Sequence, residues 1–195
     1  MNYREYVATT TASANDILAD WRWLMTPNLQ IWHVTKAGDA LLRDSADGSI
    51  HFLDTIAGKV QRIAGDRAEF EGLVATGEYA DQWLMPEIVD SQASLGMRPG
   101  INECLSFKHP PALGGQLEPD NFETCSIPIH FSIAGQIHRQ IRDLPPGTPV
   151  TNIKTEMRQT ERTLKFRWLV LSLITIVVAG IFAYLRWHGT KSTGS

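Results

Sequence analysis

An uninterrupted apolar run, FRWLVLSLITIVVAGIFAYLRW, occupies residues 166–187 of this 195-residue chain, and no residue between Trp168 and Leu185 is charged. A helix rises about 1.5 Å per residue, so a helix of this length crosses a hydrocarbon layer of roughly 30 Å. Lipid offers the backbone no hydrogen-bond partners, which favours a helix. A buried core helix is the weaker alternative, because core helices of this length usually carry a polar face. The run predicts one transmembrane helix over residues 167–187.

The cations around this run predict its orientation. They are more numerous before its apolar centre than after it: Lys154, Arg158, Arg162, Lys165 and Arg167, then Arg186 and Lys191. The cation-rich side of a span normally remains in the cytoplasm. We therefore expect a cytoplasmic domain over residues 1–150, a basic juxtamembrane stalk over 151–166 and a short outer tail over 188–195. The start of the chain lacks the apolar core of a signal peptide, which agrees with this topology.

The predicted span also offers a contact between two copies of the chain. Ala179 and Ala183 have the spacing of small residues that pairs some transmembrane helices. This spacing allows a homodimer through the span, although it often arises by chance in a short apolar helix.

The charges of the chain are divided unevenly along its length. Residues 1–150 hold 19 acidic and 11 basic side chains, a net charge of −8, whereas residues 151–195 hold 2 acidic and 7 basic side chains. Proteins that bind nucleic acid use Lys and Arg to neutralise phosphates, so we expect no nucleic-acid partner. An acidic domain is better suited to a protein partner with a basic surface. The alternative is the ordinary acidic surface of a soluble domain.

Two cysteines raise the question of a metal site. They occur in the pattern C-x4-H-x15-C-x4-H, which is formed by Cys104, His109, Cys125 and His130. Two thiolates and two imidazoles make a common zinc site, but the short ligand pairs of such sites are missing here. If the segment around Cys125 is a strand, residues five apart also point to opposite faces. We expect reduced, structural cysteines in the cytosol and neither a metal nor a cofactor.

Periodicity and turn residues predict the elements of residues 1–150. Residues 13–25 have a polar start and apolar residues at helical spacing. Short runs rich in branched and aromatic residues alternate with glycine-containing turns, as in an antiparallel meander. The expected strands are 29–35, 40–44, 49–54, 59–64, 104–107 and 123–129, and the later helices are 66–77, 80–95 and 129–144. This pattern predicts an α+β fold with one antiparallel sheet and helices on one face.

Catalytic motifs are missing from the sequence. It contains no G-x-S-x-G elbow, P-loop, H-E-x-x-H or dinucleotide fingerprint. Triads assemble from distant positions, so an enzyme remains a weak alternative. We expect a protein that is not an enzyme.

Two segments resemble a known family. They are DSADGSIHFLDTIAGKVQRIA at 44–64 and SFKHPPALGGQLEPDNFETCSIPIHFSIAGQIHRQIRDLPPGTPV at 106–150. The turn from Pro110 to Gly115, Asn121 and the segment from Gly135 to Gln140 occur in the order and spacing of this family. Over residues 18–150 the chain resembles type VI secretion immunity proteins of the Tdi C-terminal domain type, which protect against a secreted DNase.

The resemblance implies a protein that binds and neutralises a cognate toxin. Gly114 and Gly115 are expected to form a tight turn. A polar helix face with Gln136, His138, Gln140 and Asp143 is a candidate partner-binding surface, although a solvated face explains these residues equally well.

The predicted span is an addition to the family pattern. It implies an immunity protein held at the bacterial inner membrane, where confinement raises the effective concentration of its encounter with a toxin. The rival hypothesis is a membrane-anchored sensory or scaffold module.

Overall fold

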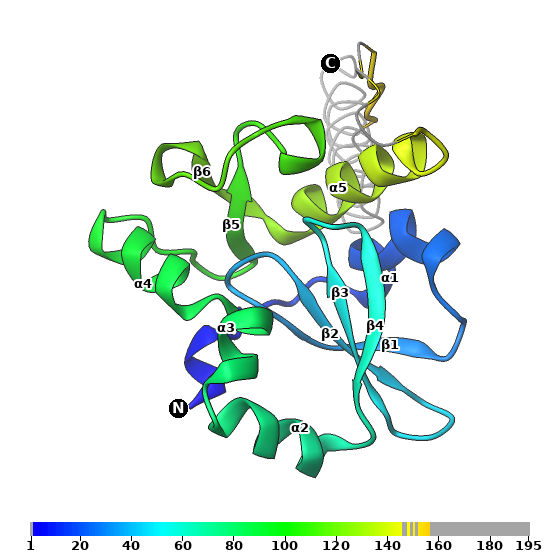
Figure 1. Ribbon diagram of the computed structural model, residues 1–195, viewed down its shortest axis with the longest axis vertical. Coiled ribbons are helices and arrows are strands. Elements are labelled where there is room, and N and C mark those ends of the chain that lie inside the picture. Colours follow the sequence, from blue (N-terminus) through cyan, green and yellow to red (C-terminus); the bar gives the residue numbers. More distant parts are fainter. Residues whose placement is uncertain (1, 146–147, 149, 151, 157–195) are drawn as a thin grey trace, which may run out of the picture. The chain divides into compact units, whose positions relative to one another are not determined.

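The computed structural model describes residues 2–145, 148, 150 and 152–156. These residues form a four-stranded sheet, a separate two-stranded sheet and surrounding helices (Figure 1). The strands are β1 Leu29–Val34, β2 Ala40–Asp44, β3 Ile50–Asp54, β4 Lys59–Ala64, β5 Glu103–Phe107 and β6 Phe122–Ser126. The α-helices are α1 Ala14–Leu18, α2 Arg67–Ala75, α3 Glu78–Leu84, α4 Pro86–Ser94 and α5 Ile127–Ile141. The 3-10 helices are η1 Tyr3–Tyr6, η2 Ala19–Leu24, η3 Pro111–Leu113 and η4 Pro119–Asn121.

The first four strands form the predicted antiparallel meander. Their order in the sheet is β1-β2-β3-β4, and each strand pairs with the next along the chain. Gly38, Gly48 and Gly58 lie in the three connecting turns with φ of 99°, 79° and 65°. Glycine adopts this left-handed conformation without a steric penalty, which explains why each turn contains one.

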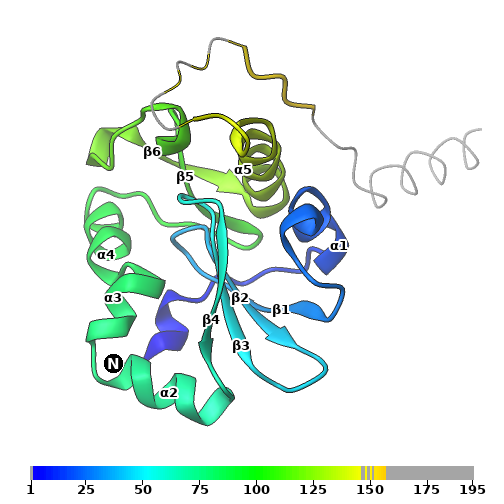
Figure 2. The same ribbon diagram turned by 45° about the vertical axis from the view of Figure 1, so that its right-hand side comes forward.

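Helices cover both faces of this sheet, so the expectation of helices on one face is wrong (Figure 2). Successive side chains of a strand point to opposite faces. Leu42 and Leu53 pack with α1, η2 and α5, whereas Leu41 and Phe52 pack with α2 and α3. The reason is visible in the sequence of the inner strands: β2 begins with three consecutive apolar residues, as a strand buried on both faces does.

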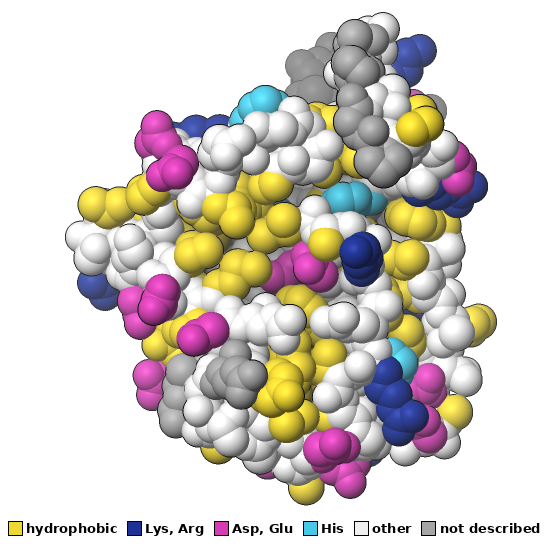
Figure 3. All heavy atoms as spheres, in the orientation of Figure 1, with side chains coloured by type: hydrophobic (Ala, Val, Ile, Leu, Met, Phe, Trp, Pro, Cys, Tyr) yellow, Lys and Arg dark blue, Asp and Glu magenta, His cyan; other side chains and the backbone are white. Residues whose placement is uncertain are grey.

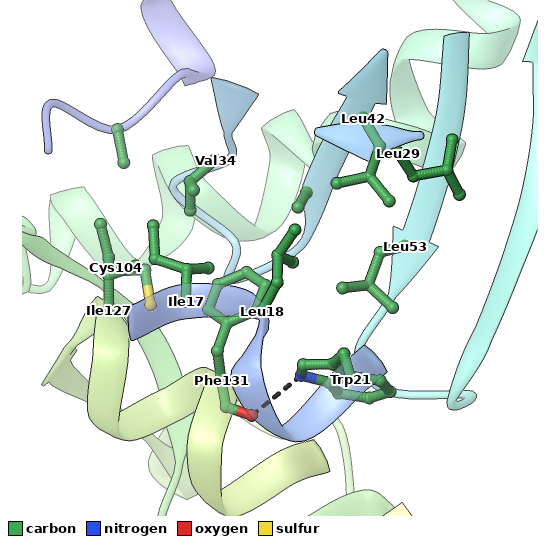
Figure 4. Packing of buried hydrophobic residues seen from close by; sticks show 12 residues of the cluster. Ile17, Leu18, Trp21, Leu29, Val34, Leu42, Leu53, Cys104, Ile127 and Phe131 are labelled. Carbon is green, nitrogen blue, oxygen red and sulfur yellow. Dashed lines mark hydrogen bonds between the residues drawn. The ribbon is translucent and has the colours of Figure 1, made fainter. Parts of the chain in front are cut away.

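One face of the sheet is closed by Trp21 of η2 and Phe131 of α5. Both side chains are fully buried, and the indole N–H of Trp21 donates to the backbone carbonyl of Phe131 at 2.9 Å (Figure 4). Ile17 and Leu18 fill the space between them and the strands. Gly135 lets η2 approach α5 closely, because a Cβ there would lie 2.8 Å from the carbonyl oxygen of Asp20. This packing fixes the position of α5.

The other face is closed by an aromatic cluster. Phe70 of α2 is fully buried and lies edge-on to Tyr3 and to Trp32, with ring centroids 5.5 and 5.4 Å apart. Trp83 of α3 stacks on Phe70 at 5.8 Å. Edge-to-face and offset contacts of this kind add to the stability gained by burial alone.

The prediction of one sheet is also wrong, because β5 and β6 form a sheet of their own. They pair antiparallel, with Leu105 opposite Thr124. The backbone N–H of Leu105 donates to the carbonyl of Lys36 at 2.8 Å and so ties the hairpin to the β1–β2 turn. Helix α4 covers the hairpin through Val89, which packs in one cluster with Leu105 and Phe122.

The helix predicted over residues 13–25 is only partly α-helical. It begins as expected, because the Ser13 side chain caps it by accepting from the backbone N–H of Asp16 at 3.1 Å. From Ala19 the chain continues as the 3-10 helix η2. The indole N–H of Trp23 donates to the backbone carbonyl of Asp20 at 2.8 Å. In an α-helix this carbonyl would accept from the backbone N–H four residues later.

The helix predicted over residues 80–95 is divided into α3 and α4. Met85 between them has φ of +47°, and Pro86 is the first residue of α4. Proline disfavours the right-handed helical conformation in the residue before it, which ends α3 and starts a new helix.

The strand predicted over residues 123–129 ends at Ser126, and α5 begins at Ile127. Pro128 lies in the first turn of α5, where a missing N–H costs no hydrogen bond. The last helix therefore starts two residues earlier than expected and ends at Ile141 rather than at 144.

The predicted transmembrane helix at 167–187 and the outer tail at 188–195 lie outside the described residues, as do most residues of the stalk. Among the helices that the structure describes, none is long and apolar enough to cross a membrane.

Candidate functional site

A surface pocket lies between α5, the β5–β6 hairpin and the β3–β4 turn. Its volume is about 550 Å³ when its open mouth is included. Its apolar lining residues are Ile56, Phe107, Pro110, Pro111, Ala112, Ile133, Ala134 and Ile137. Its polar lining residues are Thr55, Ser106, Glu123, Cys125, His130 and His138. Figure 3 shows hydrophobic side chains gathered over the region of β5 and β6, with acidic side chains beside them.

Two histidines of α5 hold the β3–β4 turn against the pocket. The His138 Nε2 donates to the backbone carbonyl of Thr55 at 2.9 Å. The His130 Nε2 lies 2.8 Å from the carbonyl oxygen of Gly38 and 3.4 Å from the Thr55 hydroxyl. Burial lowers the pKa of both imidazoles, to about 4 for His130. They are therefore neutral at physiological pH and act here as hydrogen-bonding groups.

A buried carboxyl group completes this network. One oxygen of Asp39 accepts hydrogen bonds from the backbone N–H and the hydroxyl of Thr55, at 2.8 and 2.9 Å. Its other oxygen is buried and has no hydrogen-bond partner among the described residues. Burial raises the pKa of Asp39 to about 7, because the charged form is poorly solvated there. Asp39 thus joins the β1–β2 turn to the β3–β4 turn beneath the pocket.

The hydroxyl of Ser106 lies 2.9 Å from the Nδ1 of His130. Since the Gly38 carbonyl accepts from Nε2, the Nδ1 is the acceptor for the Ser106 hydroxyl. A nucleophilic serine is activated by an imidazole in this way. The base must take up a proton in the reaction, however, and a pKa of about 4 disfavours that step for His130. The arrangement is better suited to holding β5 against α5.

Two turn glycines are required by the same histidines. A Cβ at Gly58 would collide with the ring of His138, and a Cβ at Gly38 would lie 2.8 Å from the Nε2 of His130. Both glycines also have positive φ, which disfavours any side chain. The two hairpin turns can approach α5 only because they carry glycine at these positions.

The candidate partner-binding residues do not share one face of α5. His138 is only 9% exposed, and its ring contacts that of Trp21 in a tilted arrangement with ring centroids 5.7 Å apart. Residues four apart lie on the same helix face and residues two apart do not, so Gln136 and Gln140 are neighbours while His138 points inward. Asp143 is exposed after the end of α5 and forms an ion pair with Arg142 at 3.0 Å. Contact of any of them with a partner stays a prediction.

Gly114 and Gly115 form the predicted tight turn beside the pocket. Gly114 follows η3 with φ of +96°. Asn121 holds the loop: its amide donates to the carbonyls of His109 and Gln116 at 2.9 and 2.7 Å. A Cβ at Gly115 would collide with the backbone carbonyl of His109, which cannot rotate away. The turn therefore requires glycine for two different reasons, positive φ at one position and close packing at the other.

We expect Gly115→Ala to lower the free energy of unfolding by about 1–3 kcal/mol, because it overpacks a backbone contact. Gly72→Ala is the matched control, since no atom lies within 4 Å of a Cβ at this exposed position in α2. That control should be neutral or stabilise by about 0.5–1 kcal/mol. Denaturant unfolding of the full chain measures both, and equal effects would contradict the packing argument.

The four cysteine and histidine residues of the sequence pattern do not converge on one point. Cys104 is buried and Cys125 half-buried, and they lie opposite each other on β5 and β6 as free thiols. His130 is engaged with Gly38 and Ser106, as described above. Among the described residues, no group of three or more Cys, His, Asp or Glu side chains is arranged to hold a metal ion.

Thr55, Ser106 and Asp39 belong to this site but were not predicted from the sequence. Each belongs to a different element, and their positions along the chain have no recognisable spacing. The one available signal was the glycine in each of the two turns that face α5.

Comparison with known proteins provides one family match. Residues 64–138 match the family model described as "T6SS immunity protein Tdi1, C-terminal", where T6SS denotes the type VI secretion system. The match supports the family that the sequence resembles, and it spans less than half of the chain. No curated protein matches. A solved structure, the crystal structure of Atu4351 from Agrobacterium tumefaciens, matches with a TM-score of 0.47 and 16% identity, covering 75% of this chain and 74% of that chain.

Proposed function

We propose that this chain is a type VI secretion immunity protein of the Tdi1 C-terminal family, which binds a cognate effector and blocks it. The observation that carries the proposal is the family match over residues 64–138. That segment runs from the end of β4 through most of α5, and it contains every pocket residue except Thr55 and Ile56.

The pocket is the proposed docking surface for the effector. Its walls are mostly apolar, and Glu123 is an exposed carboxylate among its lining residues. Such a pocket is suited to an effector surface that carries an apolar side chain, which enters the pocket, next to a cation, which pairs with the carboxylate. The net charge of −8 over residues 1–150 favours the same basic partner by steering its approach.

Inhibition by binding is the proposed mechanism, without catalysis. The only Ser–His pair of the pocket contains an imidazole whose pKa burial lowers to about 4. A surface that covers an effector needs shape and charge rather than a reacting group. Residues held in place by buried hydrogen bonds, such as Thr55, keep that shape constant.

The apolar run at 167–187 is the proposed anchor in the bacterial inner membrane, with residues 1–150 in the cytoplasm. Its support is the length of the run and the excess of cations before it. Tethering confines the domain to the membrane and raises its effective concentration for an effector that arrives or acts there.

A membrane-anchored scaffold module is the second candidate. The apolar run favours it as strongly as it favours an anchored immunity protein. The two hypotheses differ in the partner, because only an immunity protein protects a cell from a toxin.

Co-expression with the product of the neighbouring gene tests the proposal. We expect the cells to survive only when this chain is present, and the two proteins to co-purify from the membrane fraction. Cell death without a complex would contradict the immunity function and favour the scaffold. Unchanged protection after removal of residues 160–195 would show that the anchor is not needed.

We expect Ala112→Trp to weaken effector binding by at least about tenfold, because the indole fills the pocket from its η3 edge. Gln116→Trp is the matched control: it adds the same side chain at an exposed position of the same loop, outside the pocket. Binding is measured with the purified full chain and effector. Equal effects of the two variants would show that the effector docks elsewhere.

A further inference from the structure

Residues 152–156 are attached to α5 by two glutamine side chains. The Gln136 amide pairs with both backbone groups of Glu156: it donates to the carbonyl at 2.9 Å and accepts from the N–H at 2.7 Å. The Gln140 amide pairs with Lys154 in the same way, at 2.9 and 3.2 Å. We call Gln136 and Gln140 the glutamine ladder.

The spacing of the ladder matches an extended chain. Residues four apart on a helix are separated by about 6 Å along its axis. Alternate residues of an extended chain are separated by about 6.6 Å, and their backbone groups point to the same side. The two glutamines, which are the rungs of the ladder, therefore pair with alternate residues of the segment: Gln136 with Glu156 and Gln140 with Lys154. The contacts use main-chain atoms, so the ladder recognises an extended conformation rather than particular side chains.

Buried groups hold the ladder in position. The second hydrogen of the Gln136 amide is directed to the hydroxyl of Ser132 at 2.9 Å, and this hydroxyl donates to a carboxylate oxygen of Asp20 at 2.7 Å. Ser132 and Asp20 are 8% and 6% exposed. The Gln140 amide also donates to the backbone carbonyl of Gln136 at 3.1 Å. Both rungs are thus oriented by the domain and not only by the segment they bind.

We propose that the glutamine ladder is a main-chain binding site whose ligand is this chain's own stalk, and that it determines where the membrane tether begins. The second part rests on the proposed anchor. Between the end of α5 and residue 167 there are 25 residues, whereas only 10 lie between Glu156 and residue 167. At about 3.3 Å per residue, binding shortens the longest free tether from roughly 80 Å to roughly 33 Å. The ladder therefore keeps the domain close to the membrane.

Hydrogen exchange of the full chain in lipid nanodiscs tests the binding site. We expect the amides of Lys154 and Glu156 to be protected and the amide of Thr155, which alternates to the other side, to exchange quickly. In the double variant Gln136→Ala, Gln140→Ala, both protected amides should exchange about tenfold faster or more. Arg139→Ala, at an exposed position of α5 between the two rungs, is the control and should leave the pattern unchanged.

Protection of the α5 amides in the double variant shows that the helix is intact. Equal exchange of residues 154–156 in the wild type and the double variant would overturn the binding site.

Energy transfer between a dye on the domain and labelled lipid tests the tether. The double variant should show a longer mean distance from the membrane than the wild type. An unchanged distance with lost amide protection would overturn the tether role alone. A full chain that does not enter nanodiscs would refute the anchor, and exchange in solution then still tests the ladder.

Discussion

Trp21→Ala is expected to lower the free energy of unfolding by about 3–5 kcal/mol, the range for truncating a large buried aromatic residue. Trp21 is fully buried where η2, α5 and the sheet meet. The substitution leaves a cavity at this junction. It also removes the hydrogen bond from the indole N–H to the Phe131 carbonyl, which then keeps only its hydrogen bond within α5.

Denaturant unfolding of the full chain measures this loss. Leu95→Ala is the control, because it truncates an apolar side chain that is 66% exposed, and it should change stability by less than about 0.5 kcal/mol. A loss below about 1 kcal/mol for Trp21→Ala would contradict its role in holding α5 on the sheet. Since α5 forms one wall of the pocket, effector binding should fall together with stability.

Asp39→Asn is expected to change how stability depends on pH. The folded pKa of Asp39 is about 7, against an ordinary value of 3.8. Between these values the native state keeps a proton that the unfolded chain releases, so stability falls as pH rises. One pKa unit corresponds to about 1.36 kcal/mol, and the whole loss is about 4 kcal/mol.

His130 acts in the opposite direction. Its folded pKa is about 4, against an ordinary value of 6.5. Between these values the unfolded chain binds a proton that the native state excludes, so stability rises with pH by about 3 kcal/mol. The two contributions largely cancel in the wild type between pH 4 and 6.5.

The free energy of unfolding, measured from pH 4 to pH 7, separates the two groups. Between pH 4 and pH 6.5, the free energy of unfolding of Asp39→Asn should rise by about 3 kcal/mol more than that of the wild type, because the opposing contribution of Asp39 is gone. Asp81→Asn, which changes an exposed aspartate of α3, should keep the wild-type profile. Parallel profiles for the wild type and Asp39→Asn would contradict a buried carboxyl that holds its proton near neutral pH.

Much of the domain was predictable because local signals agree with the final fold. The four strands of the meander, the turn at Gly114 and the start of α2 after its cap Asp66 each follow from residues within a few positions of one another. The predicted elements differ from the observed ones where a distant contact or a proline determines the local structure. Pro86 divided one predicted helix, and Pro128 turned the end of a predicted strand into α5.

The candidate site was predicted less well than the fold. The sequence singled out Gln136 and Gln140, and the structure brings them together on one face of α5, where they bind the stalk. It grouped His138 with them, but a helix turns 100° per residue and directs His138 into the core. The pocket itself was not predicted: its walls come from three separate parts of the chain, and the turn glycines Gly38 and Gly58 were its one signal in the sequence.

By itself, the sequence determined the strand and turn pattern of residues 29–64, the acidic character of residues 1–150, the family resemblance and the prediction of a membrane span. Periodicity, turn chemistry and charge are properties of neighbouring residues, so they can be read without coordinates. Only the tertiary structure decided that both faces of the sheet are covered, that β5 and β6 form a second sheet, and that His130 and His138 hold Thr55 beneath a pocket. These features depend on contacts between residues far apart in the chain, such as Thr55 with His138, and no local pattern encodes which distant partners meet.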